Sequence, residues 1–347
     1  MANANDERRH DPTDAELWNE SWYFDFAAAD GSVGGYVRLG LYPNLGVSWY
    51  WAYLVGDAMR DACGTDASVL AVKHHEAALP KAEVLEVRED GLWSALHCET
   101  PHDHWTIGLE AFAVALETPG DAYRGERGDK VAFGLDLEWE AAGPVYDYPG
   151  VTRYEQSCRV SGEILVGQER IEFDASGQRD HSWGVRDWWR TSWVWTAGAL
   201  DDGTRFHGTH LFLPGDARYE PAYAIDPASG ELRSAVDQFD ADVENADDED
   251  RFPVRTGMRL LDLDMVCEPV GFAPVQLEAP DGRIGRFPRA MCRFTTVDGA
   301  RSGYGWTEWN QPPPAQNDAL VAARADGRGN RGEQRLAGGD VHQPGLG

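Results

Sequence analysis

The chain of 347 residues is long enough for two domains with separate cores, and its 42% apolar and 26% charged residues are a globular composition. Its 59 acidic residues against 31 basic ones give a net charge of −28, which excludes nucleic acid as a partner, because such partners are held by basic side chains. No apolar run reaches the roughly eighteen residues of a membrane span, and the polar N-terminus lacks a secretory signal, so we expect no transmembrane segment and a cytoplasmic location.

The charge balance also indicates the solvent to which the surface is adapted. Lysine occurs only at Lys73, Lys81 and Lys130, so arginine supplies nearly all of the positive charge. Repulsion among excess carboxylates is tolerable where salt shortens the Debye length to roughly 3 Å at 1 M. We therefore expect a halophilic, acidic protein, with an ordinary acidic protein as the alternative.

Short β-rich runs separated by Asp-Gly turns dominate the chain, and helical periodicity is scarce. The run Val47–Val55 places Trp49, Trp51 and Tyr53 on one face if it is a strand, because alternate side chains share a face. A stripe of this kind is more typical of a barrel core than of a ligand wall. Many short strands with regular turns predict an all-β sandwich or barrel, and the chain divides near residues 167–177 into halves that each suit one barrel.

Two segments have a composition unlike the rest. Asp237–Asp250 has eight acids in fourteen residues and is interpreted as a solvated loop. The alternative, a calcium loop, lacks the glycine and the glutamate at the required spacing. After Gln311 the chain becomes rich in Gly, Arg, Asp and Gln without an apolar period, which predicts a disordered tail.

The segment Asp180–Trp189 (DHSWGVRDWW) is the densest in chemistry, with an imidazole, two carboxylates, a guanidinium and three indoles. An Asp–His pair can fix an imidazole tautomer, and an Arg–Asp pair can brace a loop. Tryptophans lower the local dielectric and shift pKa values towards catalytic use. The alternative is a purely structural polar tie where two sheets meet.

This segment is similar to the signature of carotenoid 1,2-hydratases and their AttH-type relatives. Two further stretches resemble the same family: Glu20–Phe26 followed by Asp30-Gly31 resembles its opening strand and turn, and Gly303–Trp309 resembles its closing strand. The resemblance covers roughly residues 13–311. It implies two consecutive lipocalin-like antiparallel β-barrels around a ligand cavity.

On this basis the chain divides into four parts. We expect a flexible N-terminus at residues 1–12, a first lipocalin-like domain at 13–175, a second at 176–312 and a disordered tail at 313–347.

The resemblance further implies an apolar, isoprenoid- or lipid-like ligand and its hydration, dehydration or isomerisation. Hydration needs a carboxylic acid that protonates an alkene, and aromatic faces that stabilise the carbocation. His181 and Trp183 match the family's His and Trp. The strand on which the family has its acid and a tyrosine corresponds to Thr204–His210, which contains neither, so Asp180, Asp187 and Glu308 are the candidate acids.

We therefore expect a polar centre of His181 with Asp180 and Glu308 as catalytic residues, and a brace of Arg186 with Asp187. The predicted binding residues are aromatic and imidazole side chains: Trp183, Trp188, Trp193, Trp195, His207 and His210.

We expect neither a cofactor nor a metal. His181, His207 and His210, or the pair His102 and His104, could converge, but no carboxylate or cysteine stands at clear ligand spacing beside them. The five cysteines include no C-x-x-C pair, which argues against a disulfide framework and a zinc knuckle. Two other classes of function remain open: a non-catalytic carrier of an apolar metabolite, and a protein that uses the barrel surface for interactions. The oligomeric state has no sequence signal.

Overall fold

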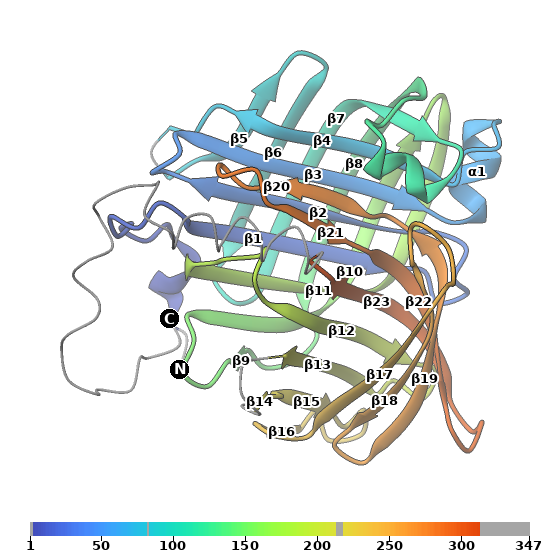
Figure 1. Cartoon of the computed structure of the whole chain (residues 1–347). Helices are drawn as coiled ribbons and strands as arrows, with labels where there is room; N and C mark the ends of the chain where they lie inside the picture. Colours follow the sequence, from blue (N-terminus) through green and yellow to red (C-terminus); the bar gives the residue numbers. More distant parts are fainter. Residues whose placement is uncertain (1–2, 82, 213–217, 313–347) are drawn as a thin grey trace.

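The computed structural model describes residues 3–81, 83–212 and 218–312. The tail predicted from residue 313 lies outside the described residues. The described chain forms two large antiparallel sheets that curl like barrels and pack against each other (Figure 1), which confirms the all-β, two-barrel fold class.

The first sheet closes on itself. Its strands follow the order β4-β3-β2-β1-β11-β10-β8-β7, and β7 pairs with β4 to complete the circuit, while β6 and β5 extend from β7 and β9 pairs with β10. The bounds are β1 Trp18–Ala27, β2 Gly34–Tyr42, β3 Val47–Val55, β4 Val69–Ala77, β5 Leu85–Glu89, β6 Leu92–Thr100, β7 His104–Leu116, β8 Asp129–Ala141, β9 Tyr146–Asp147, β10 Arg153–Val166 and β11 Glu169–Val185.

The second sheet is curled, and its path ends at β16 and β17. The order is β16-β15-β13-β12-β23-β22-β19-β18-β17, with β14 on β13 and a separate hairpin of β20 and β21. The bounds are β12 Ser192–Leu200, β13 Arg205–Phe212, β14 Arg218–Tyr219, β15 Ala222–Ile225, β16 Leu232–Ala235, β17 Phe239–Asn245, β18 Pro253–Leu260, β19 Leu263–Phe272, β20 Val275–Glu278, β21 Ile284–Phe287, β22 Arg289–Thr296 and β23 Ser302–Asn310.

Helices are few and short in the described residues. They are the α-helix α1 Asp57–Cys63 and the 3-10 turns η1 Ala4–Glu7 and η2 Pro119–Tyr123. None of the helices in the described ranges is both long and apolar enough to cross a bilayer.

Alternation along the strands creates three large apolar cores, and a smaller cluster forms from Tyr146, Tyr148, Tyr223 and Ile225. One face of β1, with Trp22 and Phe24, fills the first barrel, while Tyr23 points to the other side and packs between the two sheets. The three aromatic residues of Val47–Val55 share one face as expected. Tyr50, Ala52 and Leu54 fill the first barrel, however, so the stripe expected as barrel core instead joins the inter-sheet core. The hairpin β20–β21 also packs there, lying across the first sheet (Figure 1). The second barrel has its own core, which includes Trp309.

Two segments differ from the expectation. β11 runs to Val185 and pairs with β1 and β10 along its length, so the boundary expected at residues 175/176 falls inside a strand of the first sheet. The solvated loop expected at Asp237–Asp250 is wrong for its first half, which forms β17. There the acids alternate with the more buried Phe239, Ala241 and Val243, so a strand can expose its charges on one face.

Candidate functional site

A pocket of about 290 Å³ lies between the two sheets. Sites at the junction of two domains are common, because neither half has to open its own core to admit a ligand. The first sheet contributes Ser21, Tyr23, Arg38, Arg153, Asp180 and Ser182; the second sheet contributes Trp193, Trp195, Thr209, Leu211, Arg289 and Glu308; and the segment between them contributes Arg186, Asp187, Trp188 and Thr191.

The first wall is a row of side chains in register across five strands. Trp51 on β3 pairs with Arg38 on β2, Arg38 with Tyr23 on β1, Tyr23 with Asp180 on β11, and Asp180 with Glu155 on β10. Directly opposed residues share a face of the sheet, so this register delivers all five side chains to the same side.

The opposite wall is a second row in register. Trp195 on β12 pairs with Glu308 on β23, which pairs with Arg289 on β22. The two rows meet across the gap: Trp195 donates its indole N–H to Glu155 at 2.9 Å, and the Arg289 guanidinium lies 4.6 Å from the centre of the Tyr23 ring.

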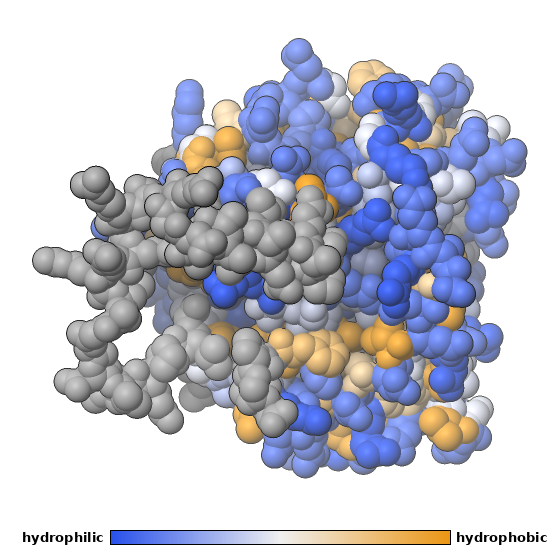
Figure 2. All heavy atoms as spheres, in the orientation of Figure 1, coloured by the Kyte–Doolittle hydropathy of each residue, from blue (hydrophilic) through white to orange (hydrophobic). Residues whose placement is uncertain are grey.

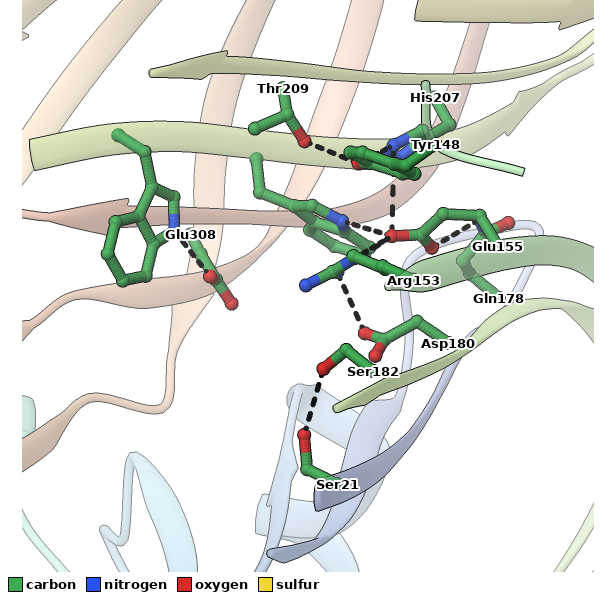
Figure 3. A network of polar contacts seen from close by, with 12 residues as sticks. Ser21, Tyr148, Arg153, Glu155, Gln178, Asp180, Ser182, His207, Thr209 and Glu308 are labelled. Carbon is green, nitrogen blue, oxygen red and sulfur yellow. Dashed lines mark hydrogen bonds and ion pairs between the residues drawn. The ribbon is translucent and has the colours of Figure 1, made fainter. Parts of the chain in front are cut away.

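Arg153 joins two carboxylates at the polar end of the pocket (Figure 3). Its Nη2 lies 2.7 Å from Glu155 Oε1 and 2.9 Å from Asp180 Oδ2. Below Asp180, the hydroxyls of Ser21 and Ser182 lie 3.2 Å apart.

The two carboxylates titrate in opposite directions. Burial raises the pKa of Asp180 to about 7, and the negative charges of Glu155 and Glu308 add to the rise, while Arg153 and Arg38 oppose it. Burial acts on Glu155 too, but the charge of Arg153, with hydrogen bonds from Trp195 and Gln178, holds its pKa below the usual value. Below about pH 7 the site thus places a protonated carboxyl, Asp180, beside an ionised carboxylate, Glu155.

A tyrosine stands above the two carboxylates. The Tyr148 hydroxyl lies 2.5 Å from His207 Nε2 and 2.7 Å from Thr209 Oγ1 (Figure 3). Burial lowers the pKa of His207 to about 4 despite Glu155, so this imidazole is neutral near pH 7. His207 does not line the pocket, but it touches pocket residues through the Tyr148 hydroxyl and the Trp195 ring, whose centroid lies 5.4 Å from that of the imidazole.

The indoles form the apolar wall. Trp188, Trp193 and Trp195 line the pocket, and Trp193 donates its N–H to Glu308 at 2.7 Å. Arg289 donates through Nε to the other oxygen of Glu308 at 2.8 Å. Both Glu308 oxygens are therefore held by neighbours.

His181 and Trp183 face away from the pocket, because they alternate with Asp180 and Ser182 along β11. His181 is fully buried and stacks on Trp22, with ring centroids 4.4 Å apart. Its Nε2 lies 2.9 Å from Glu20 Oε1, and burial lowers the pKa of His181 although Glu20 opposes this.

The N-terminal residues complete this second polar cluster, which differs from the flexible segment expected at residues 1–12. The His10 ring stacks on Trp183 at 3.8 Å and its Nδ1 lies 2.7 Å from Glu20 Oε1. Among the described residues, His10, Glu20 and His181 bring three metal-ligand atoms within 4.8 Å of one another. Hydrogen bonds at 2.7 and 2.9 Å connect these atoms, so the cluster joins the N-terminus to β1 and β11.

The remaining predicted residues lie at different places. His210 is buried beside Glu220, 3.7 Å from its carboxylate, and is not among the pocket residues. Arg186 and Asp187 do line the pocket, but Asp187 pairs with Arg283 at 2.8 Å instead of with Arg186. Arg186 bonds the backbone oxygens of residues 183 and 185. The brace therefore ties the connecting segment to the hairpin region of the second half.

Sequence reasoning missed several residues at or beside the pocket: Arg38, Tyr148, Arg153 and Glu155. The available signal was weak: Arg38 is a lone charge inside the otherwise apolar strand GYVRLGLY, and Arg153 and Glu155 alternate within RYEQ. Buried strands rarely contain an unpaired charge, so a lone arginine in such a run is informative.

Comparisons with known proteins agree with the fold. Residues 3–313 match the model of a family described as a domain of unknown function, DUF7064. A candidate AttH from Nitrosomonas europaea has a similar structure, with 16% identity, a TM-score of 0.60 and coverage of 89% of this chain and 96% of that one. Kievitone hydratase from Nectria haematococca has 11% identity, a TM-score of 0.56 and coverage of 85% and 89%. CghA with Sch210972 has 13% identity, a TM-score of 0.50 and coverage of 85% and 88%. No curated protein matches the chain by sequence.

Proposed function

The chain belongs to the DUF7064 family, and from the geometry of its inter-sheet pocket we propose that it binds an apolar small molecule there and adds water across a carbon–carbon double bond of that molecule, or removes water in the reverse direction. The observation that supports this most is Asp180, a pocket carboxyl whose pKa is raised to about 7 beside an aromatic wall.

The proposed reaction uses Asp180 as the general acid. The Asp180 carboxyl gives its proton to one alkene carbon, and the π electrons form the new C–H bond, leaving a carbocation on the other carbon. Water adds to that carbon, and the proton it releases returns to the Asp180 carboxylate, so one alkene and one water give one alcohol. A general acid with a pKa near the working pH is the most effective, because it is both present and strong enough to donate.

The aromatic wall suits the intermediate. The faces of Trp188, Trp193 and Trp195 and of Tyr23 attract a cation, by about 2 kcal/mol or more when water is excluded. Ser21 and Ser182 offer hydroxyls that can orient the attacking water beside Asp180. Glu308 stays in the proposal as an electrostatic partner of the cation.

The volume and the fold relatives support the ligand class. About 290 Å³ is at the small end of ordinary ligand pockets, so an isoprenoid- or lipid-like molecule of modest size fits the proposal. One structural relative bears the name of a hydratase and another holds Sch210972, which makes hydration the reaction to test first.

The experiment combines ligand recovery with isotope labelling. First, any ligand extracted from the purified protein is identified by mass spectrometry. The protein is then incubated in ¹⁸O-water with that ligand and, separately, with each member of a panel of isoprenoid and phenolic alkenes. We expect a product heavier by one labelled water, formed more slowly as pH rises past about 7, where Asp180 loses its proton.

Asp180→Asn should lower this rate about 100-fold or more, which is the usual contribution of a general acid. The control is Asp174→Asn, on the same strand but exposed and paired with Arg159. A ligand that is recovered unchanged, with no labelled product from any alkene, would instead identify a carrier.

A further inference from the structure

The pocket is basic, although the chain as a whole has a net charge of −28. Four arginines line it: Arg38, Arg153, Arg186 and Arg289. Arg153 pairs with Asp180 and Glu155, and Arg289 pairs with Glu308. Within the described ranges, no carboxylate lies at ion-pair distance from Arg38 or Arg186. Arg186 bonds two backbone oxygens, which leaves Arg38 as the least satisfied cation of the pocket.

Arg38 is buried, with 2% of its surface exposed, and both Nη atoms of its guanidinium lack a hydrogen-bond partner of good geometry among the described residues. Burial lowers the pKa of Arg38, and the nearby Tyr42 hydroxyl partly opposes this. A buried charge without a counter-charge is among the most unfavourable features of a protein interior. Such a feature persists where function requires it.

The surroundings of Arg38 fix its orientation. Its Cζ lies 4.5 Å from the centre of the Trp51 ring and 4.9 Å from that of Trp188, so two indoles hold the guanidinium. Gly40 on the same strand leaves the space it occupies, because a Cβ there would lie 2.5 Å from Nη1. Aromatic stacking satisfies the faces of a guanidinium and leaves its N–H edge for an acceptor.

The acceptor that fits two parallel N–H donors is a planar anion. A carboxylate accepts from Nη1 and Nη2 together, with a geometry that neither an ester nor an alcohol reproduces. We propose that the ligand of this pocket bears a carboxylate, that Arg38 binds this group, and that the apolar part of the ligand extends along Tyr23 towards Asp180. This inference rests on the proposed ligand site and adds the class of its ligand.

The register sets the spacing of the two ends. Arg38 and Asp180 flank Tyr23 across β2, β1 and β11, so their Cα atoms are two strand spacings apart, about 10 Å. An unsaturated acid with a double bond remote from its carboxylate is the form of ligand that we propose for this spacing.

The test uses a neutral reporter and a matched series of competitors with the full-length protein. N-phenyl-1-naphthylamine, which is uncharged and apolar, reports occupancy by its fluorescence. Decanoate, methyl decanoate, decanol and decyl phosphate share one chain and differ only in the head group. We expect decanoate to displace the reporter at a concentration at least about tenfold below the ester and the alcohol, the usual gain from a charge-assisted bidentate pair.

Arg38→Met should abolish the preference for decanoate over the ester and the alcohol, measured as a ratio of competitor concentrations within each protein. It should not lower the unfolding temperature, because it removes a buried charge without a counter-charge. Arg38→Lys keeps the charge, loses the paired donors and should give an intermediate preference. Arg233→Met makes the same charge change at an exposed site, beside Asp262, and should leave the preference intact.

The outcomes separate the two proposals. If the reporter binds but all four competitors displace it equally, or if Arg38→Met retains the preference, the carboxylate assignment is overturned and the apolar pocket stands. A preference for decyl phosphate over decanoate also overturns it, in favour of a phosphate. If neither the reporter nor any competitor binds, the proposal that this pocket is a ligand site is overturned as well. Should Arg38→Met not fold, the order of the four competitors in the native protein and in Arg38→Lys decides.

Discussion

His181 and Asp180 are neighbours in the chain, but their side chains serve different parts of the molecule. Asp180 lines the pocket, whereas His181 lies on the opposite face of β11 and connects Glu20 with the Tyr154 hydroxyl at 3.3 Å. Glu20 is 1% exposed, and burial would raise its pKa, but hydrogen bonds from His10 and His181 outweigh this and lower the pKa. Glu20 is therefore a buried carboxylate that depends on its two imidazoles.

His181→Ala should destabilise the fold by about 2–4 kcal/mol, because it leaves a cavity and removes one donor from a buried carboxylate. Thermal unfolding measures the loss, and His181→Gln, which keeps an N–H donor, should recover part of it. Reporter binding in the pocket should be unchanged. A variant that unfolds at the native temperature but no longer turns over substrate would show that His181 takes part in the chemistry.

How far the sequence predicts the site depends on alternation. Trp188, Trp193 and Trp195 were predicted as binding residues and do line the pocket, together with Asp180 and Glu308. The motif alone could not separate Asp180 from His181, because its strand character was not recognised and the ten residues were treated as one cluster. Arg38 and Arg153 come from strands distant in sequence, and only the register of the folded sheet brings them to Asp180, while Tyr148 follows the short strand β9.

At the scale of elements, the N-terminal turn η1 acts as part of the first barrel. Glu7, at its end, is 5% exposed and accepts from Arg179 at 2.7 Å and from the Tyr154 hydroxyl at 2.7 Å. Burial would raise the pKa of Glu7, but the charge and hydrogen bonds of Arg179, with those of Tyr154 and the His102 backbone, lower it. The polar composition of residues 1–12 predicts a flexible segment, but Glu7 and His10 form hydrogen bonds with residues of the first barrel.

Glu7→Gln should lower the free energy of unfolding at pH 7 by about 3–5 kcal/mol, because Arg179 is left as a buried cation. The folded carboxyl binds fewer protons than the unfolded one, so its contribution is complete above the unfolded pKa of about 4.3 and is lost as pH falls through the folded value. The difference between native protein and variant should therefore shrink in acid. Denaturant unfolding from pH 7 to pH 3 measures it, with the exposed Glu16→Gln as the control. A difference independent of pH would contradict this assignment.

At the scale of the whole molecule, charged residues lie mainly on the surface and aromatic residues lie mainly in the interior. The visible face in Figure 2 is largely hydrophilic, with its hydrophobic atoms gathered in a smaller band, while the aromatic residues fill the inter-sheet core. The all-β class could be predicted because strand periodicity is local in sequence, and the family resemblance implied the two consecutive barrels. The inter-sheet packing could not, because it depends on which face of each strand meets the other barrel.

The unfolding temperature should rise when salt is increased from about 0.1 M to about 1 M, as the Debye length falls from about 10 Å to about 3 Å and the repulsion of a net charge of −28 is screened. Differential scanning calorimetry in potassium chloride measures the slope. Replacing Asp240, Asp242 and Glu244 by amides should reduce this slope, because all three are exposed. If the unfolding temperature stays constant or falls as salt is added, repulsion among the acidic side chains does not significantly destabilise the fold.

The position of those three acids has a consequence for neighbouring copies of the chain. β17 is the last strand of the second sheet's hydrogen-bonded path, and after the isolated bridge from Asp237 to Glu220 its outer edge offers backbone groups that a foreign strand could pair with. Two such edges approaching each other would bring their acidic side chains together before the hydrogen bonds could form. We therefore expect the acidic run to disfavour edge-to-edge pairing between two copies of the chain.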